Sequence, residues 1–152
     1  MRKIVVDTNI LFSSLRAKNS RLRRVLERED CRFYAPNFLM VEIFTHKERI
    51  LQKSKADEDE VYEILYQTLH KITFINEETI SPKNFIEACK LCGNIDEKDT
   101  PFIALTLEIE GELWTKDDVL KRGLIKVSIL FLRKKNNFFI FRFGVMRILR
   151  HK

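Results

Sequence analysis

Five acidic residues occupy positions where carboxylates could act together, namely Asp7, Glu42, Asp96, Asp99 and Asp117. Several carboxylates in one cleft repel one another, and the usual relief is a hard divalent cation with oxygen ligands, which implies Mg²⁺ or Mn²⁺. Two such ions roughly 3.5 to 4 Å apart can activate a water and stabilise the leaving oxygen of an in-line displacement at phosphorus. The chemistry that these residues would perform together is therefore that of a nuclease.

Taken singly, each acid has a simpler explanation. An isolated carboxylate is more often a helix cap or a solvated surface charge. For Asp99, which precedes an apolar helical segment, capping could be the whole role. The nuclease interpretation therefore depends on whether the chain brings the acids to one place.

The elements that must position the acids alternate along the chain. Short β-branched or aromatic runs predict strands at residues 3–6, 32–35, 72–75 and 112–115. Helical spacing is found at residues 9–16, 20–28, from Pro36 onward, 57–69, 81–91 and 100–110, with a further helix starting at Asp117. This alternation predicts an α/β fold with a mostly parallel sheet. Ligands of such sheets gather at the carboxyl ends of the strands, where loops and helix starts meet. We expect Asp7, Asp117 and the pair Asp96 and Asp99 at these ends, and Glu42 could reach the same place.

The composition is that of one folded domain. The chain has 152 residues, of which 45% are hydrophobic, with 4 Gly and 3 Pro, and this excludes a disordered or low-complexity protein. Three cysteines do not make a disulfide framework, so we expect a reducing compartment and a cytoplasmic protein. No run approaches the roughly 18 to 20 apolar residues of a membrane span, and no membrane contact is expected.

The formal charge of +6 is unevenly distributed. Residues 119–152 contain ten basic residues and no acidic one, so the first 118 residues hold 18 basic residues and all 22 acids. The body is thus mildly acidic, and the C-terminal segment is strongly basic. The excess of positive charge supports nucleic-acid binding only if that segment is native and exposed.

Three segments together resemble the signature segments of PIN-domain ribonucleases, a family that includes the VapC-like toxins of prokaryotic toxin–antitoxin pairs. They are VDTNIL at residues 6–11, DEKDTPFIALTLE at 96–108 and LWTKD at 113–117. Each is weak alone, and their order and spacing, with an acid between the first two, carry the resemblance. It implies a three-layer α/β/α PIN-like fold with a central, mostly parallel sheet over residues 1–125, followed by a basic, Phe-rich C-terminal segment at 126–152.

The resemblance also implies roles for individual residues. Asp7 would be the first metal ligand, Glu42 the second acid, Asp99 the third, Asp117 the fourth, often acting through water, and Asp96 an additional ligand, with Asn9 and Thr115 orienting the acids. Two features depart from the family's pattern. Lys116 replaces a small residue and would either crowd the site or pair with a phosphate, and the sequence after Gly123 does not follow the family's ending.

We therefore predict a divalent-metal-dependent endoribonuclease. RNA would be its substrate, and the resemblance allows a toxin role, an antitoxin protein as partner and a homodimer. The alternative is a non-catalytic RNA- or protein-binding module on the same fold, with the cleft blocked by Lys116. A haloacid-dehalogenase-type phosphatase is disfavoured because Asn9 stands where its second Asp would be, and a receiver-like phosphoacceptor lacks its acid pair after the first strand.

The remaining polar motifs have ordinary explanations. Cys89 and Cys92 form a C-x-x-C without a second pair, so packing is favoured over metal or redox chemistry. His46 follows Glu42 by four residues and is more simply a partly exposed histidine near a helix end than a ligand. The arginines at 21, 23, 24 and 28 form a basic face that could be solvated, contact a protein or contact phosphates.

The C-terminal segment has three interpretations. Phenylalanines at 131, 138, 139, 141 and 143 interleave with basic residues and could stack bases while neutralising phosphates. Residues 138–143 could instead form a final edge strand, with 145–149 as a helical turn docked on the body. A shift of reading frame near residue 126 would make the segment a neutral by-product.

Overall fold

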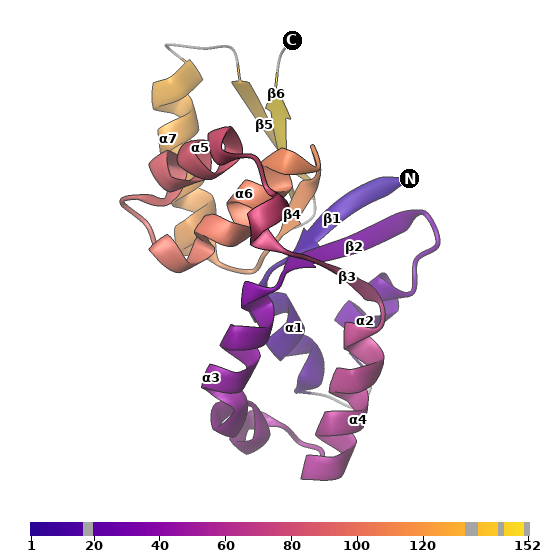
Figure 1. Ribbon diagram of the computed structural model, residues 1–152. Coiled ribbons are helices and arrows are strands. Elements are labelled where there is room, and N and C mark those ends of the chain that lie inside the picture. Colours follow the sequence, from indigo (N-terminus) through magenta and orange to yellow (C-terminus); the bar gives the residue numbers. More distant parts are fainter. Residues whose placement is uncertain (17–19, 133–136, 143–144, 151–152) are drawn as a thin grey trace.

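A mixed sheet lies at the centre of the protein. The computed structural model describes residues 1–16, 20–132, 137–142 and 145–150, with side chains up to residue 125 (Figure 1). The sheet has six strands in the order β3-β2-β1-β4-β6-β5. Its parallel part consists of β1 (Arg2–Val6), β2 (Cys31–Pro36), β3 (Ile72–Ile75) and β4 (Glu112–Trp114), and β6 (Val145–Arg150) and β5 (Asn137–Arg142) add to it in antiparallel fashion. The predicted mostly parallel sheet is confirmed.

Helices flank this sheet in two groups. One group comprises α1 (Thr8–Leu15), α2 (Arg21–Leu26), α3 (Phe38–Lys53) and α4 (Glu58–Leu69), and the other comprises α5 (Pro82–Cys92), α6 (Thr100–Glu108) and α7 (Asp118–Leu132). Short 3₁₀ turns at Glu77–Thr79 (η1) and Glu97–Asp99 (η2) precede α5 and α6. Figure 1 shows α5, α6 and α7 near β4–β6, while α1, α3 and α4 form the opposite part of the molecule. The α/β architecture agrees with the predicted PIN-like fold.

The burial pattern explains why these segments form these elements. Ile4, Val5 and Val6 of β1 are all buried, as a central parallel strand covered on both faces requires. Helix α4 begins where the Asp57 carboxylate accepts a hydrogen bond from the Glu60 N–H at 2.9 Å, and α2 begins where the Ser20 hydroxyl accepts one from the Leu22 N–H at 3.2 Å.

The order of the strands creates a switch point between β1 and β4. From β1 the chain passes to β2 and β3 on one side, and then returns to place β4 on the other side of β1. The helices that follow β1 and β4 leave the sheet in different directions at such a point, so a crevice opens at the carboxyl ends of the two strands. In the register of the pair, Val6 lies opposite Trp114, so both strands end at the same level.

The prediction that Pro36 lies in the first turn of a helix is wrong. Pro36 is the last residue of β2 and lies opposite Ile75 of β3, while α3 begins at Phe38. The Phe38 N–H donates to the Glu77 Oε1 at 2.6 Å, whereas Asn37 makes no side-chain cap. Because the cap comes from a residue distant in sequence, local patterns could not place the start of this helix.

Helix α6 also ends earlier than predicted, at Glu108 instead of Glu110. Glu110 takes a left-handed conformation with φ of 50°, and the Gly111 N–H returns to the Thr106 carbonyl at 3.0 Å. A Cβ at Gly111 would lie 2.9 Å from the Lys3 carbonyl oxygen. This position thus requires glycine because the chain passes close to β1 on its way into β4.

The C-terminal segment extends the sheet beyond β4. The edge strand predicted at 138–143 is confirmed as β5, although Phe143 lies outside the described residues. The helical turn predicted at 145–149 is wrong, because this stretch forms β6 and pairs with β4, Leu113 lying opposite Met146. That pairing satisfies the backbone groups on the open side of β4, which a helical turn would leave exposed. Residue 125, where we divide the chain on sequence grounds, lies within α7.

None of the described helices combines the length and apolarity needed to cross a bilayer.

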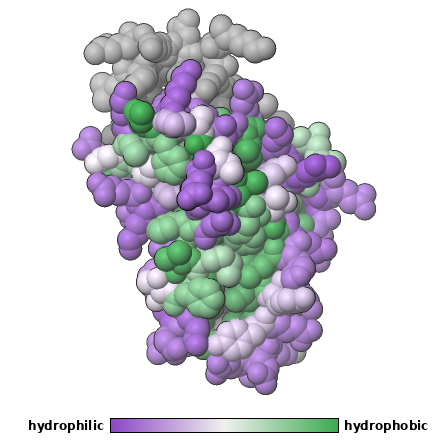
Figure 2. Space-filling model, in the orientation of Figure 1, coloured by the Kyte–Doolittle hydropathy of each residue, from purple (hydrophilic) through white to green (hydrophobic). Residues whose placement is uncertain are grey.

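The surface between α3 and α4 is apolar. A groove of about 160 Å³ runs between these helices and is lined mainly by hydrophobic side chains, including Met40, Ile43 and Leu65. Phe44 at its margin is 71% exposed. Figure 2 shows this apolar surface in the lower half of the view, between two polar borders.

Candidate active site

Asp7 is the most enclosed of the five predicted acids. It follows β1 directly and is 5% exposed. Its Oδ2 accepts two side-chain hydrogen bonds, from the Asn9 Nδ2 at 2.8 Å and from the Thr115 hydroxyl at 2.5 Å. These two hydrogen bonds hold the Asp7 carboxylate in one position, and through them Asn9 and Thr115 would orient it toward a ligand.

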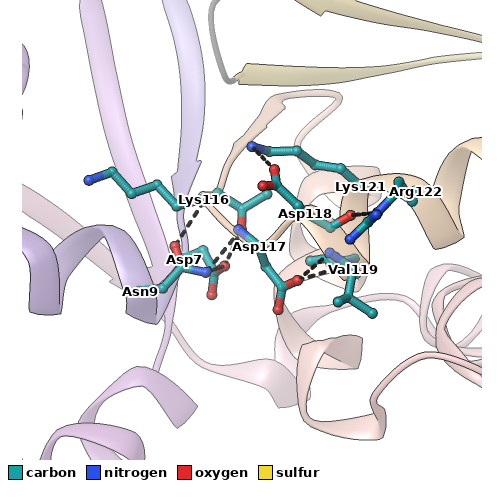
Figure 3. A network of polar contacts seen from close by, with 10 residues as sticks. Asp7, Asn9, Lys116, Asp117, Asp118, Val119, Lys121 and Arg122 are labelled. Atoms are coloured by element: carbon teal, nitrogen blue, oxygen red, sulfur yellow. Dashed lines mark hydrogen bonds and ion pairs between the residues drawn. The ribbon is translucent and has the colours of Figure 1, made fainter.

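The same two residues tie the end of β4 to the start of α1. The Asn9 Oδ1 accepts from the Lys116 N–H at 2.9 Å, and the Thr115 Oγ1 accepts from the Asp117 N–H at 2.9 Å (Figure 3). The Asn9 Nδ2 also donates to the Thr115 Oγ1 at 3.1 Å. A closed network therefore spans the switch point and sets the position of Asp7 relative to Asp117.

Asp117 stands at the amino end of α7. Its Oδ1 accepts hydrogen bonds from the Val119 and Leu120 N–H groups at 2.8 and 2.9 Å (Figure 3). These bonds satisfy orphan amides of the first helical turn and fix the side chain. Asp117 is thus a helix cap as well as a member of the acidic set, and the capping bonds use only one of its two oxygens.

Asp96 and Asp99 flank the short 3₁₀ turn before α6. The Asp96 carboxylate accepts from the Lys98 N–H at 3.0 Å and caps this turn. Asp99, in contrast, makes no side-chain cap although it occupies the cap position of α6, and its own backbone is already helical. The explanation of Asp99 as a helix cap is therefore wrong. The preceding 3₁₀ turn runs directly into α6, so the Asp99 carboxylate does not cap the helix.

Glu42 approaches from α3 on the other side of the crevice. The bond between Phe38 and Glu77 anchors the start of this helix, and the rings of Phe38 and Phe102 pack edge to face with centroids 6.4 Å apart. The second contact joins α3 to α6, which begins directly after Asp99. The Glu42 Oε2 lies 3.9 Å from the Nε2 of His46, and His46 is half-buried in the middle of α3 instead of near its end, where we predicted it.

The electrostatics of Asp99 join the five acids into one cluster. Burial raises the pKa of Asp99 to about 7, and repulsion from Asp7, Asp96, Asp117 and Glu42 raises it as well. Burial likewise raises the pKa of Asp7 to about 6, against the opposing effect of the hydrogen bond from Thr115. A group of carboxylates whose charged forms are disfavoured attracts protons or cations.

The donor chemistry suits Mg²⁺ or Mn²⁺. Carboxylate oxygens are the ligands these ions prefer, and the Thr8 hydroxyl beside Asp7 is buried with no hydrogen-bond partner among the described residues. No three acidic, histidine or cysteine side chains in the described part of the chain are close enough to hold one ion. Mg²⁺ commonly binds through one or two carboxylates and keeps several waters, so a pair such as Asp7 and Asp99 suffices for it.

Lys116 does not crowd the crevice. Its side chain is exposed, and Figure 3 shows it directed away from the Asp117 carboxylate. Only its backbone N–H takes part in the network, through Asn9. The concern that a long side chain at this position fills the site is removed.

Two other sequence motifs lie outside the cluster's chemistry. Cys92 is buried, and this burial raises the pKa of its thiol to about 12, so it packs as an inert side chain while Cys89 is exposed. The Arg28 guanidinium forms two hydrogen bonds of 2.8 Å with Asp30, before β2 begins. That ion pair lies at the amino ends of the parallel strands, so Arg28 is not beside the acids.

The fold and the site together define an α/β protein whose acids gather at the switch point of a parallel sheet. The sequence model of the PIN domain matches residues 5–134, and the chain belongs to this family. PIN domains are generally nucleases that act on RNA and commonly use divalent metal ions. A comparison with curated proteins gave no match.

Proposed function

We propose that this protein is a divalent-metal-dependent endoribonuclease that hydrolyses RNA phosphodiester bonds. The observation that carries the proposal is the hydrogen-bonded network at the switch point, which holds the buried Asp7 carboxylate in place and ties it to Asp117. Asp96 and Glu42, together with this pair, lie near enough to Asp99 for their charges to raise its pKa. Structural carboxylates are usually dispersed or paired with cations, whereas acids gathered at a switch point are typical of a metal-binding active site. Membership of the PIN domain family supports the same conclusion.

Asp7 and Asp99 would hold the metal ion, and Asp96, Glu42 and Asp117 would contribute through water molecules bound to it. The chemistry that Mg²⁺ or Mn²⁺ supplies in such sites is activation of a water molecule and neutralisation of charge on the phosphoryl group. The protein's own residues pre-organise this site. Asn9 and Thr115 both donate hydrogen bonds to the Asp7 Oδ2. These bonds fix the carboxylate, so its Oδ1 would be held in a defined position for the metal ion.

The test compares Asp7→Asn and Asp99→Asn with the matched control Asp118→Asn. Asp118 is exposed, lies one residue after Asp117 and pairs with Lys121 at 3.2 Å, so its substitution removes the same charge outside the cluster. We expect Mn²⁺-dependent cleavage of RNA and calorimetric Mn²⁺ binding to be lost in the two site variants and retained in the control. Cleavage at the wild-type rate in either site variant would exclude this assignment.

The second candidate function is a non-catalytic RNA- or protein-binding module. The apolar groove between α3 and α4 favours it, because exposed apolar surface of this kind is common where proteins bind partners. RNA binding that is unaffected by a chelator, together with no cleavage under any metal, would identify this function.

We further propose a toxin role for the nuclease, with an antitoxin protein as partner, a homodimer, a cytoplasmic location and a separate unit after residue 125. Growth arrest on expression tests the toxin role, and light scattering tests the dimer.

A further inference from the structure

A second concave site lies beside the acids, between α1 and α3. It has a volume of about 220 Å³. Its lining includes Asn9, Phe12 and Arg16 on the α1 side and His46, Arg49 and Lys53 on the α3 side. The two sets have the same i, i+3, i+7 spacing, which places each on one helical face.

The far end of this pocket is positively charged. Arg16, Arg49 and Lys53 are all exposed, and no acidic side chain is among the described residues that line the pocket. Within the described ranges none of these three cations forms an ion pair. Three like charges facing one cavity repel one another, so they favour an anion between them.

The near end of the pocket touches the acidic cluster. Asn9 lines the pocket and also donates to the Asp7 Oδ2 at 2.8 Å. His46 lines it too, with its Nε2 3.9 Å from the Glu42 Oε2. The rings of Phe12 and His46 pack edge to face with centroids 5.9 Å apart, which sets the separation of α1 and α3 at this point. Each wall of the pocket therefore runs from a residue that contacts an acid, Asn9 or His46, to the cations at its far end.

The positive end of the pocket is complementary to a polyanion that is cleaved at the neighbouring acids. A crowded set of carboxylates repels RNA, so a nuclease of this kind needs cations close by to hold the strand. Arginine binds phosphate through paired N–H groups, and lysine adds a point charge. The pocket is several times larger than the roughly 30 Å³ share of a liquid water molecule, so a hydrated phosphate group fits.

We infer that this pocket is a phosphate subsite for single-stranded RNA, in which Arg16, Arg49 and Lys53 hold the backbone phosphate next to the scissile one. The inference rests on the endoribonuclease function proposed above. It specifies on which side of the acids the strand continues, namely along the groove between α1 and α3 and away from α7.

The test measures binding and cleavage separately. The full chain carrying both Arg49→Gln and Lys53→Gln is compared with a control carrying Lys83→Gln and Lys90→Gln, two exposed positions on α5 with the same change in charge. Binding of a labelled single-stranded RNA of about 12 nucleotides is followed by fluorescence anisotropy over a range of salt concentrations in EDTA, which prevents cleavage. Thermal unfolding checks that both variants are folded.

We expect the pocket variant to bind roughly tenfold more weakly at low salt, and its log–log salt slope to shrink by about 0.7, because it loses the contact with one phosphate of a single strand. The control should retain the wild-type slope. In Mn²⁺-dependent cleavage the pocket variant should show a raised KM with an unchanged kcat, since its substituted residues lie outside the acidic cluster.

The outcomes separate this inference from the proposed function. If the wild type cleaves RNA and the pocket variant binds like the control, the subsite is refuted while the nuclease stands. If no RNA is cleaved but the pocket variant loses binding, the cations do bind RNA and the nuclease is refuted. A loss of equal size in both variants would show a non-specific charge effect and overturn the subsite.

Discussion

Replacing Asp7 with asparagine should stabilise the metal-free protein at neutral and alkaline pH while abolishing its activity. Asparagine has nearly the same shape, and its Oδ1 can accept the hydrogen bonds that Asn9 and Thr115 donate to the Asp7 Oδ2. What the substitution removes is a negative charge that is buried among other carboxylates. The variant thus separates the effect of the buried charge on the free energy of unfolding from its role in metal binding and cleavage.

The magnitude follows from the pKa of Asp7, which burial raises from 3.8 to about 6. Between these values the native state holds a proton on Asp7 that the unfolded state has released, so the free energy of unfolding falls as the pH rises through this window. At 1.36 kcal/mol per pH unit, the loss approaches about 3 kcal/mol above pH 6. Asparagine carries no charge in either state and escapes this loss, so the variant should gain up to about 3 kcal/mol.

Urea unfolding in EDTA measures this gain through the fluorescence of Trp114, the single and buried tryptophan next to the network. The difference between variant and wild type should be largest near pH 8 and should vanish below about pH 4, where Asp7 is protonated in both states. The control Asp118→Asn should change stability by no more than about 0.5 kcal/mol at any pH, because its charge is exposed.

Added Mn²⁺ should reverse the order of stability. The wild type gains free energy of unfolding by binding the ion, whereas the variant lacks the ligand and does not. An Asp7→Asn protein that is less stable than the wild type near pH 8 in EDTA would refute the electrostatic reasoning. A gain of the same size at pH 4 and at pH 8 would refute it equally, because the gain would then not depend on ionisation.

Three further outcomes are expected from the same network and its surroundings. Thr115→Val removes the hydroxyl that donates to Asp7, and metal affinity or cleavage rate should fall by roughly 10- to 100-fold in titrations and rate assays. Affinity for Mn²⁺ should fall on acidification below about pH 7, because protons then compete for Asp99, and calorimetry with Asp99→Asn should show a flatter pH dependence. Gly123→Ala should destabilise the protein by about 1–3 kcal/mol in urea unfolding, since the new Cβ would lie 2.4 Å from the Ile95 side chain. Ile95→Ala in the same chain should recover part of that loss.

Much of the fold could be predicted because its elements carry local signals. A few neighbouring residues predict each of several elements. Examples are the β-branched run of β1, the acidic first turn of α4 and the Ser-Pro start of α5. The predictions that failed concern boundaries set by distant partners. Helix α3 starts where Glu77 caps Phe38, and β6 is a strand because β4 offers an open edge. Neither partner is recognisable from the neighbouring sequence.

The candidate site was predicted in the same uneven way. Asp7 and Asp117 follow strands, so their position at one edge of the sheet was open to inference. The phosphate subsite was missed, although Arg16, Arg49 and Lys53 have a readable helical spacing. That spacing predicts a charged face on each helix, but it does not say that the two faces lie opposite each other.

The amino-acid sequence by itself determined the alternation of strands and helices and the types of residue at the strand ends, because both depend on contacts between near neighbours. Only the tertiary structure decided that five acids from four separate segments lie near one another, that Asp99 has no capping role and that cations border the acids on one side. These features depend on burial and on charges brought close in space, and the energy of both is set by the surroundings of a residue and not by its identity.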